Sequence, residues 1–435
     1  MYKQSKFNLY FERESDCFLY NSHTGSFVTL DQEYRKSFQL VAQNNISELP
    51  QMHIENFLNA GFIVSKDTDE NLIYKYLTNK TKYSSDTLGL TIATTLQCNF
   101  RCPYCYEEHL DSYFNEEKEQ ELKKFIFNNL DGKKALAITW YGGEPLLQKK
   151  MIDRVSKDVI KYCDDNKIEY YADMVSNGYL LNRETAKDLV SNNKIRSVQI
   201  TLDGGPETHN KTRFLRNGEG TFDKILENIK NIVDLINVVI RVNVSQQNID
   251  DIHKLLPILI ENGLNKKVSL YMSPVTDSEQ SCQSVSETCL KTDEFSKWEM
   301  ELIEYADKLG FDMGKMYPNN LGGSVCTAVN NGTFVIDSNG DIYKCWNEVG
   351  KPALKSGTLS EGITKSNRFI KWIEWSFPDK CMECTVFPLC KGRCPDMSLE
   401  GQDFECAQIK YNIVNRLLRF HKLESNQEKV VISAH

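Results

Sequence analysis

The chain has 435 residues and a formal net charge of −8; 40% of its residues are hydrophobic and 26% are charged. These proportions are typical of a soluble protein with two or three domains, and the acidic balance argues against a nucleic-acid partner. No apolar run is long enough for a membrane span, and the first residues lack a signal peptide. We therefore expect a cytoplasmic protein with no membrane partner, where fourteen cysteines indicate metal binding rather than disulfides.

The first 65 residues are predicted to form a small module of their own. Three apolar-rich runs have the pattern of strands, and a fourth closes the module: 7–11, 17–20, 26–30 and 62–64. Asp31 is a candidate N-cap for a helix that ends at Gln43, and Pro50 can begin a second helix that ends near Gly61. Residues 66–87, rich in Asp, Lys, Thr and Ser, are predicted to be a linker.

From residue 88 to residue 275, short β-branched runs alternate with longer amphipathic segments. The predicted strands are 89–95, 135–141, 168–175, 197–202, 238–244 and 267–272. The predicted helices are 116–130, 148–164, 182–193, 221–236 and 249–262, with another possible after the last strand. This alternation predicts an α/β fold, a partial (β/α)6 barrel similar to a TIM barrel, with active-site residues on the loops after the strands.

Three cysteines, Cys98, Cys102 and Cys105, follow the first predicted strand at C-x3-C-x2-C spacing. Three cysteines cannot form disulfides without leaving one over. A structural zinc ion normally takes four ligands, and His109 is the nearest residue that could complete a Cys3His site. A [4Fe–4S] cluster held by three thiolates would keep one iron open for another ligand. At this stage both the zinc site and the cluster are open.

With Tyr104 before the third cysteine, this pattern resembles the signature of the radical S-adenosylmethionine (SAM) family. The resemblance implies a [4Fe–4S] cluster whose open iron binds SAM, and an external electron donor such as flavodoxin or ferredoxin. In that family one electron cleaves SAM to a 5′-deoxyadenosyl radical, which takes hydrogen from the substrate. The three cysteines and Tyr104 are accordingly predicted to lie at the catalytic centre.

The ends of the next strands carry further motifs of this family. A Gly-Gly-Glu-Pro sequence resembles the family's GGEP motif, which implies that backbone and carboxylate hold the ammonium group of SAM. After the third strand, a Ser-Asn-Gly sequence stands where the family contacts the SAM carboxylate and ribose. The residues concerned are Gly142, Gly143, Glu144, Pro145, Ser176 and Asn177.

After the fourth strand, Thr201, Asp203, His209 and Arg213 resemble an S-[IL]-D-G…H…R stretch of the family's peptide-modifying branch, with Thr201 in place of the first Ser. The resemblance implies SAM contacts for Thr201, Asp203 and Arg213, and a structural role in the loop is the alternative. Arg241 puts a charge into the apolar fifth strand. It is predicted to be either an inward-facing anion ligand or a surface residue.

Seven cysteines lie in the C-terminal part of the chain. They are Cys326, Cys345, Cys381, Cys384, Cys390, Cys394 and Cys406. Their spacing, including C-x2-C-x5-C-x3-C, resembles the SPASM domain, which implies two auxiliary [4Fe–4S] clusters and therefore three clusters in all. A zinc site in the C-x2-C-x5-C-x3-C quartet is the alternative.

The SPASM resemblance also implies how the ligands divide. The distal cluster would be held by Cys381, Cys384, Cys390 and Cys406, and the proximal cluster by Cys326, Cys345 and Cys394. The fourth iron of the proximal cluster would be open or bound by Cys282 or Cys289, although an ordinary surface thiol is the simpler interpretation of either cysteine. Cys17 and Cys163 are expected to be structural.

Together these features predict a six-part chain. The parts are a peptide recognition module 1–65, a linker 66–87, the barrel 88–275, a bridging region 276–320, the SPASM domain 321–410 and a terminal helix and tail 411–435. The order of strands and helices in the first part resembles the winged-helix element that binds the leader of a ribosomally made precursor peptide; a cap without a binding role is the alternative.

We therefore predict an enzyme that abstracts hydrogen from a precursor-peptide side chain and forms an intramolecular thioether or carbon–carbon cross-link. The auxiliary clusters would accept or relay the remaining electron. The runner-up is an anaerobic sulfatase-maturating enzyme, which oxidises Cys or Ser to formylglycine. A non-enzymatic iron–sulfur scaffold or zinc adaptor would not need the Gly142–Pro145 motif.

Overall fold

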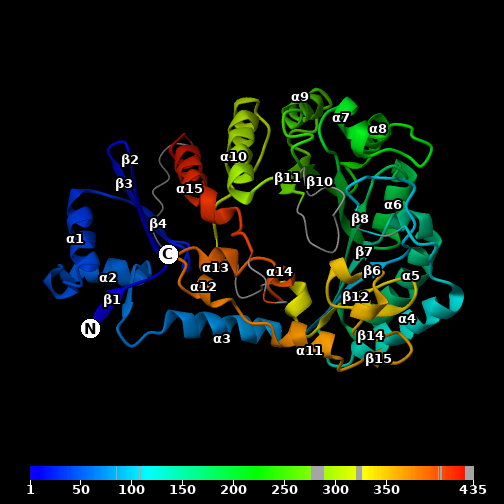
Figure 1. Cartoon of the computed structure of the whole chain (residues 1–435), viewed down its shortest axis with the longest axis horizontal. Coiled ribbons are helices and arrows are strands. Elements are labelled where there is room, and N and C mark those ends of the chain that lie inside the picture. Colours follow the sequence, from blue (N-terminus) through cyan, green and yellow to red (C-terminus); the bar gives the residue numbers. More distant parts are fainter. Residues whose placement is uncertain are drawn as a thin grey trace. The chain divides into compact units, whose positions relative to one another are not determined.

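The computed structural model describes residues 1–84, 86–105, 107, 109–275, 289–319, 326–399, 401 and 404–426. The chain divides into two compact units (Figure 1). The first unit comprises residues 1–82, 314–325 and 376–435, and the second comprises residues 83–313 and 326–375. Residues 321–410, predicted to form the SPASM domain, have parts in both units, and this domain stays a prediction.

The second unit is built on a ten-stranded sheet in the order β11-β10-β9-β8-β7-β6-β12-β13-β14-β15. Its six parallel strands are β6 Thr87–Ala93, β7 Ala135–Tyr141, β8 Glu169–Ser176, β9 Ile195–Thr201, β10 Asn237–Val244 and β11 Val268–Pro274. All six predicted strands are present, and their parallel order is the arrangement expected of a partial barrel.

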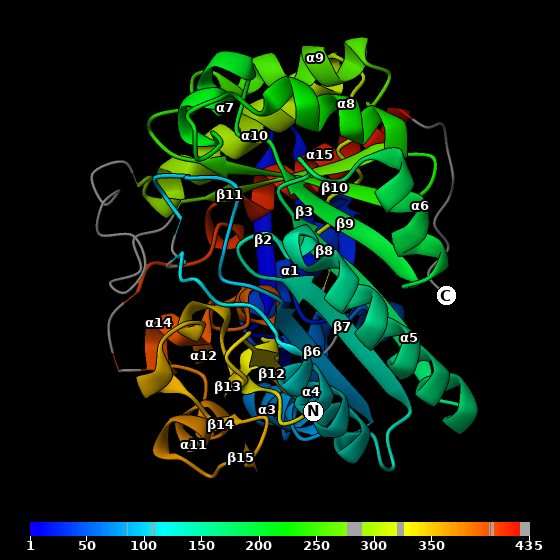
Figure 2. The ribbon, with the colours of Figure 1, turned by 90° about the vertical axis from the view of Figure 1, so that its right-hand side faces the viewer.

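Helices connect these strands. They are α4 Glu116–Asn129, α5 Lys149–Asn166, α6 Arg183–Ser191, α7 Pro206–Thr212, α8 Phe222–Ile232, α9 Leu255–Glu261 and α10 Thr292–Lys308. Figure 2 shows α4, α5 and α6 along the outer face of β6 to β8. Asn115 and Asn182 cap α4 and α6 by accepting hydrogen bonds from the amides of Lys118 and Thr185.

The helix predicted over 249–262 is interrupted in the structure. A 3₁₀ turn, η3 Ile252–Lys254, precedes the shorter helix α9. Pro257 accounts for the change. It has no N–H group to donate to the carbonyl of the residue one turn earlier, and its ring crowds that carbonyl. The prediction therefore placed the start of this helix too early.

Residues after Cys326 extend the barrel sheet beyond β6. Strand β12 Thr333–Ile336 pairs parallel with β6, and β13 Asp341–Tyr343, β14 Gly357–Thr358 and β15 Gly362–Ile363 continue antiparallel. Short turns η5 Thr327–Val329, η6 Trp346–Glu348 and η7 Pro352–Leu354 and the helix α11 Asn367–Glu374 complete this region. The buried Glu348 carboxylate accepts hydrogen bonds from Trp372 and Arg368 and so attaches α11 to η6.

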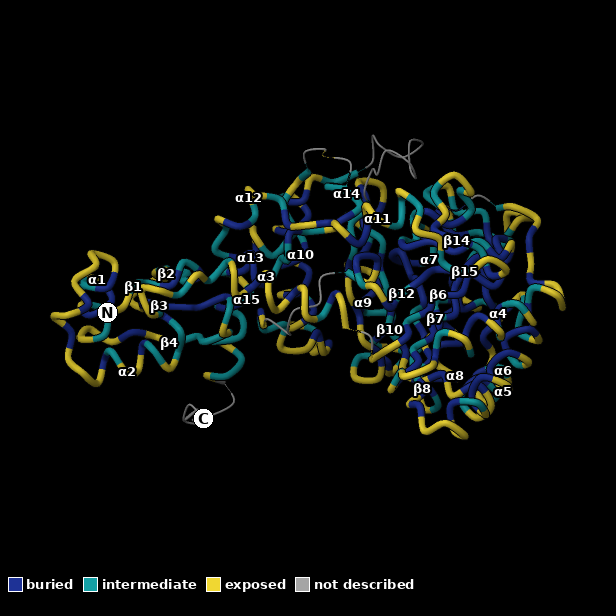
Figure 3. Tube along the Cα trace, turned by 90° about the horizontal axis from the view of Figure 1, so that it is seen from below, coloured by how far each residue is buried: buried dark blue, intermediate teal, exposed yellow. Residues whose placement is uncertain are grey.

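Burial alternates along the barrel strands. In β10, Val238, Ile240, Val242 and Val244 are fully buried, whereas Arg241 and the other residues between them are partly exposed. Figure 3 shows β6 and β7 among the buried residues, with exposed residues on the surrounding helices. The apolar set therefore packs beneath the helices, and the alternate set lies on the inner face of the sheet.

The first unit contains a three-stranded antiparallel sheet, β2 Asn8–Arg13, β3 Asp16–Asn21 and β4 Phe27–Leu30. Helices α1 Gln32–Ala42 and α2 Gln51–Asn59 follow, separated by the 3₁₀ turn η1 Ile46–Glu48, and β1 Tyr2–Gln4 pairs with β5 Ile63–Ser65. Asp31 caps α1 as predicted, accepting a 2.8 Å hydrogen bond from the amide of Tyr34. The predicted order of strands and helices is present; its winged-helix character stays a prediction.

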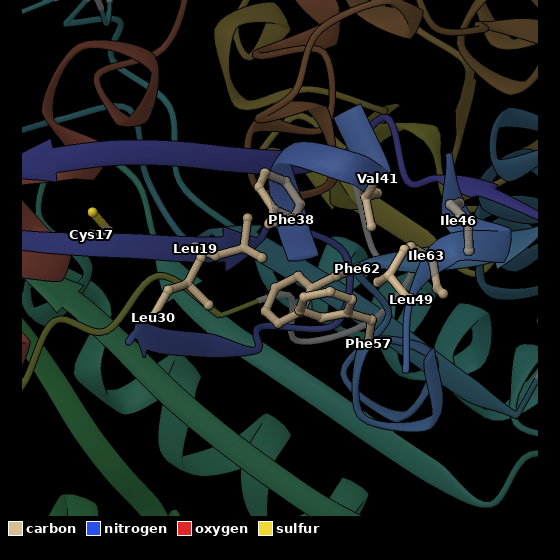
Figure 4. Close-up of a cluster of buried hydrophobic side chains, with 10 residues drawn as sticks. All are labelled: Cys17, Leu19, Leu30, Phe38, Val41, Ile46, Leu49, Phe57, Phe62 and Ile63. Atoms are coloured by element: carbon tan, nitrogen blue, oxygen red, sulfur yellow. The ribbon is translucent and has the colours of Figure 1, made fainter. Parts of the chain in front are cut away.

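Both faces of the small sheet are covered. On one face Leu19 and Leu30 pack with Phe38, Phe57 and Phe62 in a buried apolar cluster (Figure 4). On the other face Tyr20 packs with Ile413 and Leu417 of the terminal helix α15 Ile409–Asn426. The module predicted over residues 1–65 therefore shares its second core with the end of the chain.

The prediction that residues 66–87 form a linker is corrected by helix α3 Glu70–Lys82. Tyr74 on this helix is buried, its ring lies 4.8 Å from that of Phe387, and its hydroxyl donates to the carbonyl of Pro388. Polar composition suggested a linker, but one buried aromatic residue attaches the helix to a segment about 300 residues further along. The helices α12 Asp379–Met382, α13 Phe387–Cys390 and α14 Pro395–Leu399 belong to the same unit. None of the described helices is long and apolar enough to cross a membrane.

Candidate functional site

The three-cysteine loop begins directly after β6 and is held by backbone hydrogen bonds. The amide of Arg101 donates to the carbonyl of Phe214, and the amide of Arg216 donates to the carbonyl of Asn99, both at 3.0 Å. Phe100 is buried within the loop, and its amide points toward the Sγ atom of Cys98 at 3.4 Å. The loop is thus fixed to the segment that follows β9.

The three thiols lie close enough to influence one another. Burial, then the charge of Glu144, and then the thiols of Cys102 and Cys105 raise the pKa of Cys98 to about 12. Burial, followed by the charge of Glu107, likewise raises the pKa of Cys105 to about 12. Cationic iron would stabilise the thiolate forms that this buried environment disfavours. The site therefore suits a metal centre better than it suits free thiolates.

Tyr104 lies in a buried polar network beneath the loop. Its hydroxyl donates to the carboxylate of Asp203 and accepts a 2.9 Å hydrogen bond from the guanidinium of Arg213. The other carboxylate oxygen of Asp203 accepts from the backbone amide of Asn243 at 2.8 Å. Asp203 is fully buried and Arg213 is 7% exposed, so both charges depend on these contacts. The predicted residues Tyr104, Asp203 and Arg213 are therefore brought together, as partners of one another.

His209 and Thr201 support the same loop. The amide of Asp203 donates to Nδ1 of His209, so Nε2 carries the proton and donates to the hydroxyl of Thr221. Burial, with a smaller effect of Arg213, holds the pKa of His209 well below its usual value, and the imidazole is neutral. Thr201 is buried and lies opposite Arg241 in the pairing of β9 with β10.

The two glycines after β7 are required by close backbone contacts. A Cβ atom on Gly142 would lie 2.3 Å from the carbonyl oxygen of Thr95, and one on Gly143 would lie 2.3 Å from that of Gln97. The amides of Gly143 and Glu144 donate to these same carbonyls at 3.0 Å. The glycines therefore let the loop after β7 pack directly on the start of the cysteine loop.

Glu144 is fully buried and its carboxylate joins two strand ends. It accepts hydrogen bonds from the amide of Leu146 at 3.0 Å, the hydroxyl of Ser176 at 2.9 Å and the amide of Asn177 at 2.7 Å. Burial raises its pKa to about 7 despite these donors. The side-chain amide of Asn177 donates to Asn99 at 2.7 Å and lies 3.8 Å from Sγ of Cys98. Contact of these residues with the ammonium, carboxylate or ribose of SAM stays a prediction.

Polar residues line the inner face of the sheet near the carboxyl ends of β9 to β11. Tyr271 donates to Gln199 at 2.6 Å, and Arg241 donates to Asn243 and Ser273 at 2.7 and 3.2 Å. Of these, only Arg241 was expected from the sequence. The signal for the others is a polar residue at every second position of an apolar strand, which places them together on one face.

The residues present fit a [4Fe–4S] cluster. Zinc ligands at 2.3 Å in a tetrahedron would place sulfur atoms only about 3.8 Å apart. The described residues contain no group of three or more His, Cys, Asp or Glu side chains grouped closely enough for a single ion. In a four-iron cluster each thiolate binds a different iron, so the sulfurs are spaced more widely. Together with SAM, such a cluster supplies a one-electron cleavage that yields a carbon-centred radical.

Four C-terminal cysteines in the first unit also lie near one another. After burial, the charges of Cys390, Cys406 and Cys384 raise the pKa of Cys381, to about 11. Lys410 donates to Sγ of Cys406 at 3.4 Å. These are the four residues predicted to hold the distal cluster, and their proximity is what such a cluster requires.

The predicted proximal ligands come from both units. Cys326 and Cys345 begin the turns η5 and η6 in the second unit, whereas Cys394 belongs to the first. Cys289 lies just before α10, and Cys282 falls outside the described residues. The other two cysteines, Cys17 and Cys163, are buried in the small sheet and in α5, as expected for structural residues.

Residues 92–257 match the family model described as the Radical SAM superfamily. This stretch runs from β6 to α9 and includes the three-cysteine loop and the loops after β7, β8 and β9. This part of the chain is similar to a radical SAM domain, and the radical SAM proteins to which the chain is related are enzymes. A [4Fe–4S] cluster and SAM are the cofactors that this domain implies.

The chain is also similar in sequence to individual radical SAM enzymes. The chain is 26% identical over 335 residues to the cysteine-type anaerobic sulfatase-maturating enzyme of Clostridium novyi (strain NT), covering 68% of this chain and 84% of that protein. It is 30% identical over 195 residues to a GTP 3′,8-cyclase of Clostridium perfringens (strain 13 / Type A), covering 43% and 56%.

Solved structures share the fold. One is anSMEcpe with bound AdoMet, with a TM-score of 0.63 and 20% identity over 77% of this chain and 100% of that chain. Another is Streptococcus suis SuiB bound to the precursor peptide SuiA, with a TM-score of 0.53 and 17% identity over 92% and 98%. Both likenesses include the mixed α/β fold with its large parallel sheet, and at these identities they are likenesses of fold alone.

Proposed function

We propose that this enzyme modifies a ribosomally made precursor peptide, abstracting hydrogen from one of its side chains and forming an intramolecular thioether or carbon–carbon cross-link. The observation that carries this proposal is the extent of the likeness to SuiB, a protein solved with a precursor peptide. The aligned share of 92% leaves out about 35 of the 435 residues, fewer than the 65 of the N-terminal module. The likeness therefore includes at least part of that module.

Within this proposal the N-terminal sheet is the site for the leader of the peptide. The edge strands of the sheet are β2 and β4, and an extended peptide can pair with such an edge through its backbone. Hydrogen–deuterium exchange measures this directly: the precursor should slow exchange in β2 or β4. Unchanged exchange in both strands would favour a cap without a binding role.

Deleting the module is a poor test, because the structure shows that Tyr20 packs against Ile413 and Leu417. Removing residues 1–65 would expose those apolar side chains and could unfold the first unit. Exchange measurements on the full chain avoid this problem.

The chemistry is a two-electron oxidation of the peptide. When a C–H and an S–H bond are replaced by a C–S bond, the peptide loses two hydrogens. One would leave as a hydrogen atom to the 5′-deoxyadenosyl radical that SAM supplies, and the other would leave as a proton while its electron passes to an acceptor. We assign the acceptor role to clusters held by the C-terminal cysteines, so that the protein would carry three [4Fe–4S] clusters. An external electron donor such as flavodoxin or ferredoxin would start each turnover.

A second candidate is sulfatase maturation, in which a cysteine becomes formylglycine. It is favoured by the similarity to the C. novyi enzyme, which extends over 68% of this chain. The test is to incubate the anaerobically reconstituted enzyme with SAM, a reductant and a cysteine-containing precursor encoded beside its gene. A product lighter by two hydrogens and without aldehyde reactivity supports the cross-link, whereas an aldehyde-reactive product supports the maturase.

The control for this assay is the protein with Cys98, Cys102 and Cys105 all replaced by Ala. It should make neither product and should form no 5′-deoxyadenosine. Product formation by this variant would contradict both candidates.

A further inference from the structure

Arg241 occupies a position on the inner face of the barrel that its neighbours in the sheet define. It pairs with Thr201 of β9 on one side and with Tyr271 of β11 on the other. Its neighbours in sequence, Ile240 and Val242, are fully buried on the opposite face, whereas Arg241 is half-buried. Arg241 therefore lies on the face of the strand opposite to the apolar set.

Within the described part of the chain, the acceptors that the guanidinium of Arg241 contacts are neutral. Its Nε atom donates to Asn243 at 2.7 Å, and one terminal nitrogen donates to the hydroxyl of Ser273 at 3.2 Å. A guanidinium has five N–H donors, so three of them have no acceptor among the residues that the structure describes. Among the residues that the structure describes, no ion pair includes Arg241.

Asp203 does not serve as a charged partner of Arg241. Arg241 lowers the pKa of Asp203 less than Arg213, Tyr104 and the amide of Asn243 do. The carboxylate of Asp203 already accepts from Tyr104 and from the amide of Asn243. A partly exposed guanidinium with donors that no described residue uses can bind an anion through them.

Neighbouring side chains add further donors. Tyr271 donates to the side-chain oxygen of Gln199, which leaves the amide N–H groups of Gln199 available. The position is also close to the cysteine loop, because the side chain of Asn243 lies 3.4 Å from the hydroxyl of Tyr104. An anion bound to Arg241 would thus lie next to the centre where the radical forms.

We propose that Arg241, with Ser273 and Gln199, binds a carboxylate of the peptide substrate, either an Asp or Glu side chain or the C-terminus. This rests on the proposed function as a peptide-modifying enzyme and deepens it. The planar fork of arginine matches both oxygens of a carboxylate, which gives orientation as well as affinity. The contact would hold the reacting residue in place beside the cysteine loop.

SAM also has a carboxylate, but strand spacing favours the peptide. The residues expected to hold the carboxylate of SAM, Ser176 and Asn177, lie at the end of β8, which is two strands from β10. Neighbouring strands are about 4.8 Å apart, so this separation is about 10 Å. A carboxylate of the peptide can instead lie directly beside Arg241, Ser273 and Gln199, because their strands β9 to β11 are neighbours in the sheet.

The experiment uses the full-length reconstituted enzyme with SAM and no reductant, so that binding is measured without turnover. The probes are two sets of capped pentapeptides, each with a central cysteine flanked by alanines. In one set a single flanking alanine is replaced by Glu, and in the other set it is replaced by Gln; each flanking position is tested in turn. Calorimetry measures the affinity of each set. The wild type should bind the Glu set about 10- to 100-fold more tightly, as expected for a hydrogen-bonded charge pair.

Three variants test whether Arg241 is the source of the preference for the Glu peptides. Arg241→Met should abolish it, and Arg241→Lys should retain only part of it, because the charge remains without the fork. Arg196→Met is the matched control: Arg196 lies on β9, is exposed and stacks over the ring of Tyr171, so the preference should be unchanged. SAM affinity should change by no more than about twofold in any of them.

Equal affinity of the wild type for the two sets, including failure of both to bind, would overturn the proposal. So would a preference that survives in Arg241→Met, or a tenfold loss of SAM affinity in that variant, which would assign the arginine to SAM. A separate measurement, product formation after reduction, tests the proposed function. An enzyme that prefers the Glu set but makes no peptide product after reduction would contradict that function and keep the carboxylate site.

Discussion

Replacing Tyr104 with Phe removes one oxygen atom from the network beneath the cysteine loop. That oxygen donates to Asp203 and accepts from Arg213. Hydrogen bonds to charged groups contribute about 1.5–3 kcal/mol each, so losing both would cost about 3–6 kcal/mol. Asp203 and Arg213 attract each other and can partly make up the loss, and we therefore expect the second unit to be destabilised by about 2–4 kcal/mol.

Urea unfolding of the cluster-free protein measures this change. With a denaturant dependence of about 3 kcal/mol per molar, the midpoint of the second unit should fall by about 1 M. Tyr113→Phe is the matched control, because the hydroxyl of Tyr113 also donates to a carboxylate, that of Asp111, but is exposed. Its midpoint should not move measurably. Equal midpoints for Tyr104→Phe and the wild type would show that the network is not a source of stability.

Three other predictions concern the pH dependence of protein stability, the packing of the loop after β7 on the cysteine loop, and the iron content of the protein. Asp337 is buried and burial raises its pKa to about 6, above the value of about 3.9 in an unfolded chain, so the cost of its charge develops as the pH rises from about 4 to 6. Asp337→Asn should therefore be more stable than the wild type by up to about 3 kcal/mol at pH 8 and equal to it at pH 3.5, and a difference independent of pH in urea unfolding would be evidence against this. Gly143→Ala must displace the backbone of Gln97 and should lower SAM cleavage at least tenfold, whereas the control Gly205→Ala, whose nearest contact is a side-chain oxygen at 3.3 Å, should retain it. Anaerobic reconstitution should give about twelve irons in the wild type and about eight when the three cysteines of the first loop are replaced; about four irons in the wild type, or stoichiometric zinc, would refute the auxiliary clusters.

Local patterns in the sequence were enough to predict the barrel and the position of its centre. Apolar residues at every second position predicted β10, and the Asp31 side chain marked the start of α1. The spacing of the cysteines in the first loop and the Gly142–Gly143 pair were equally visible, because loop chemistry after a strand depends on neighbours in sequence. What these patterns have in common is short range: strand periodicity, helix caps and tight turns are properties of a few consecutive residues.

Tertiary structure alone decided how those motifs are used. Glu144 accepts from Ser176, 32 residues away, and Arg213 reaches Tyr104 across 109 residues. Residues 70–82 resembled a linker in sequence but form a helix, and Tyr74 on this helix packs against Phe387. The sequence did not reveal this contact, because Phe387 lies far along the chain. The periodic pattern of apolar residues along a strand or helix does not predict such contacts between distant residues. They arise when packing brings distant strand ends together and each buried polar group must find a partner. The same requirement draws attention to Arg241, which forms hydrogen bonds with Asn243 and Ser273 but no ion pair among the residues that the structure describes.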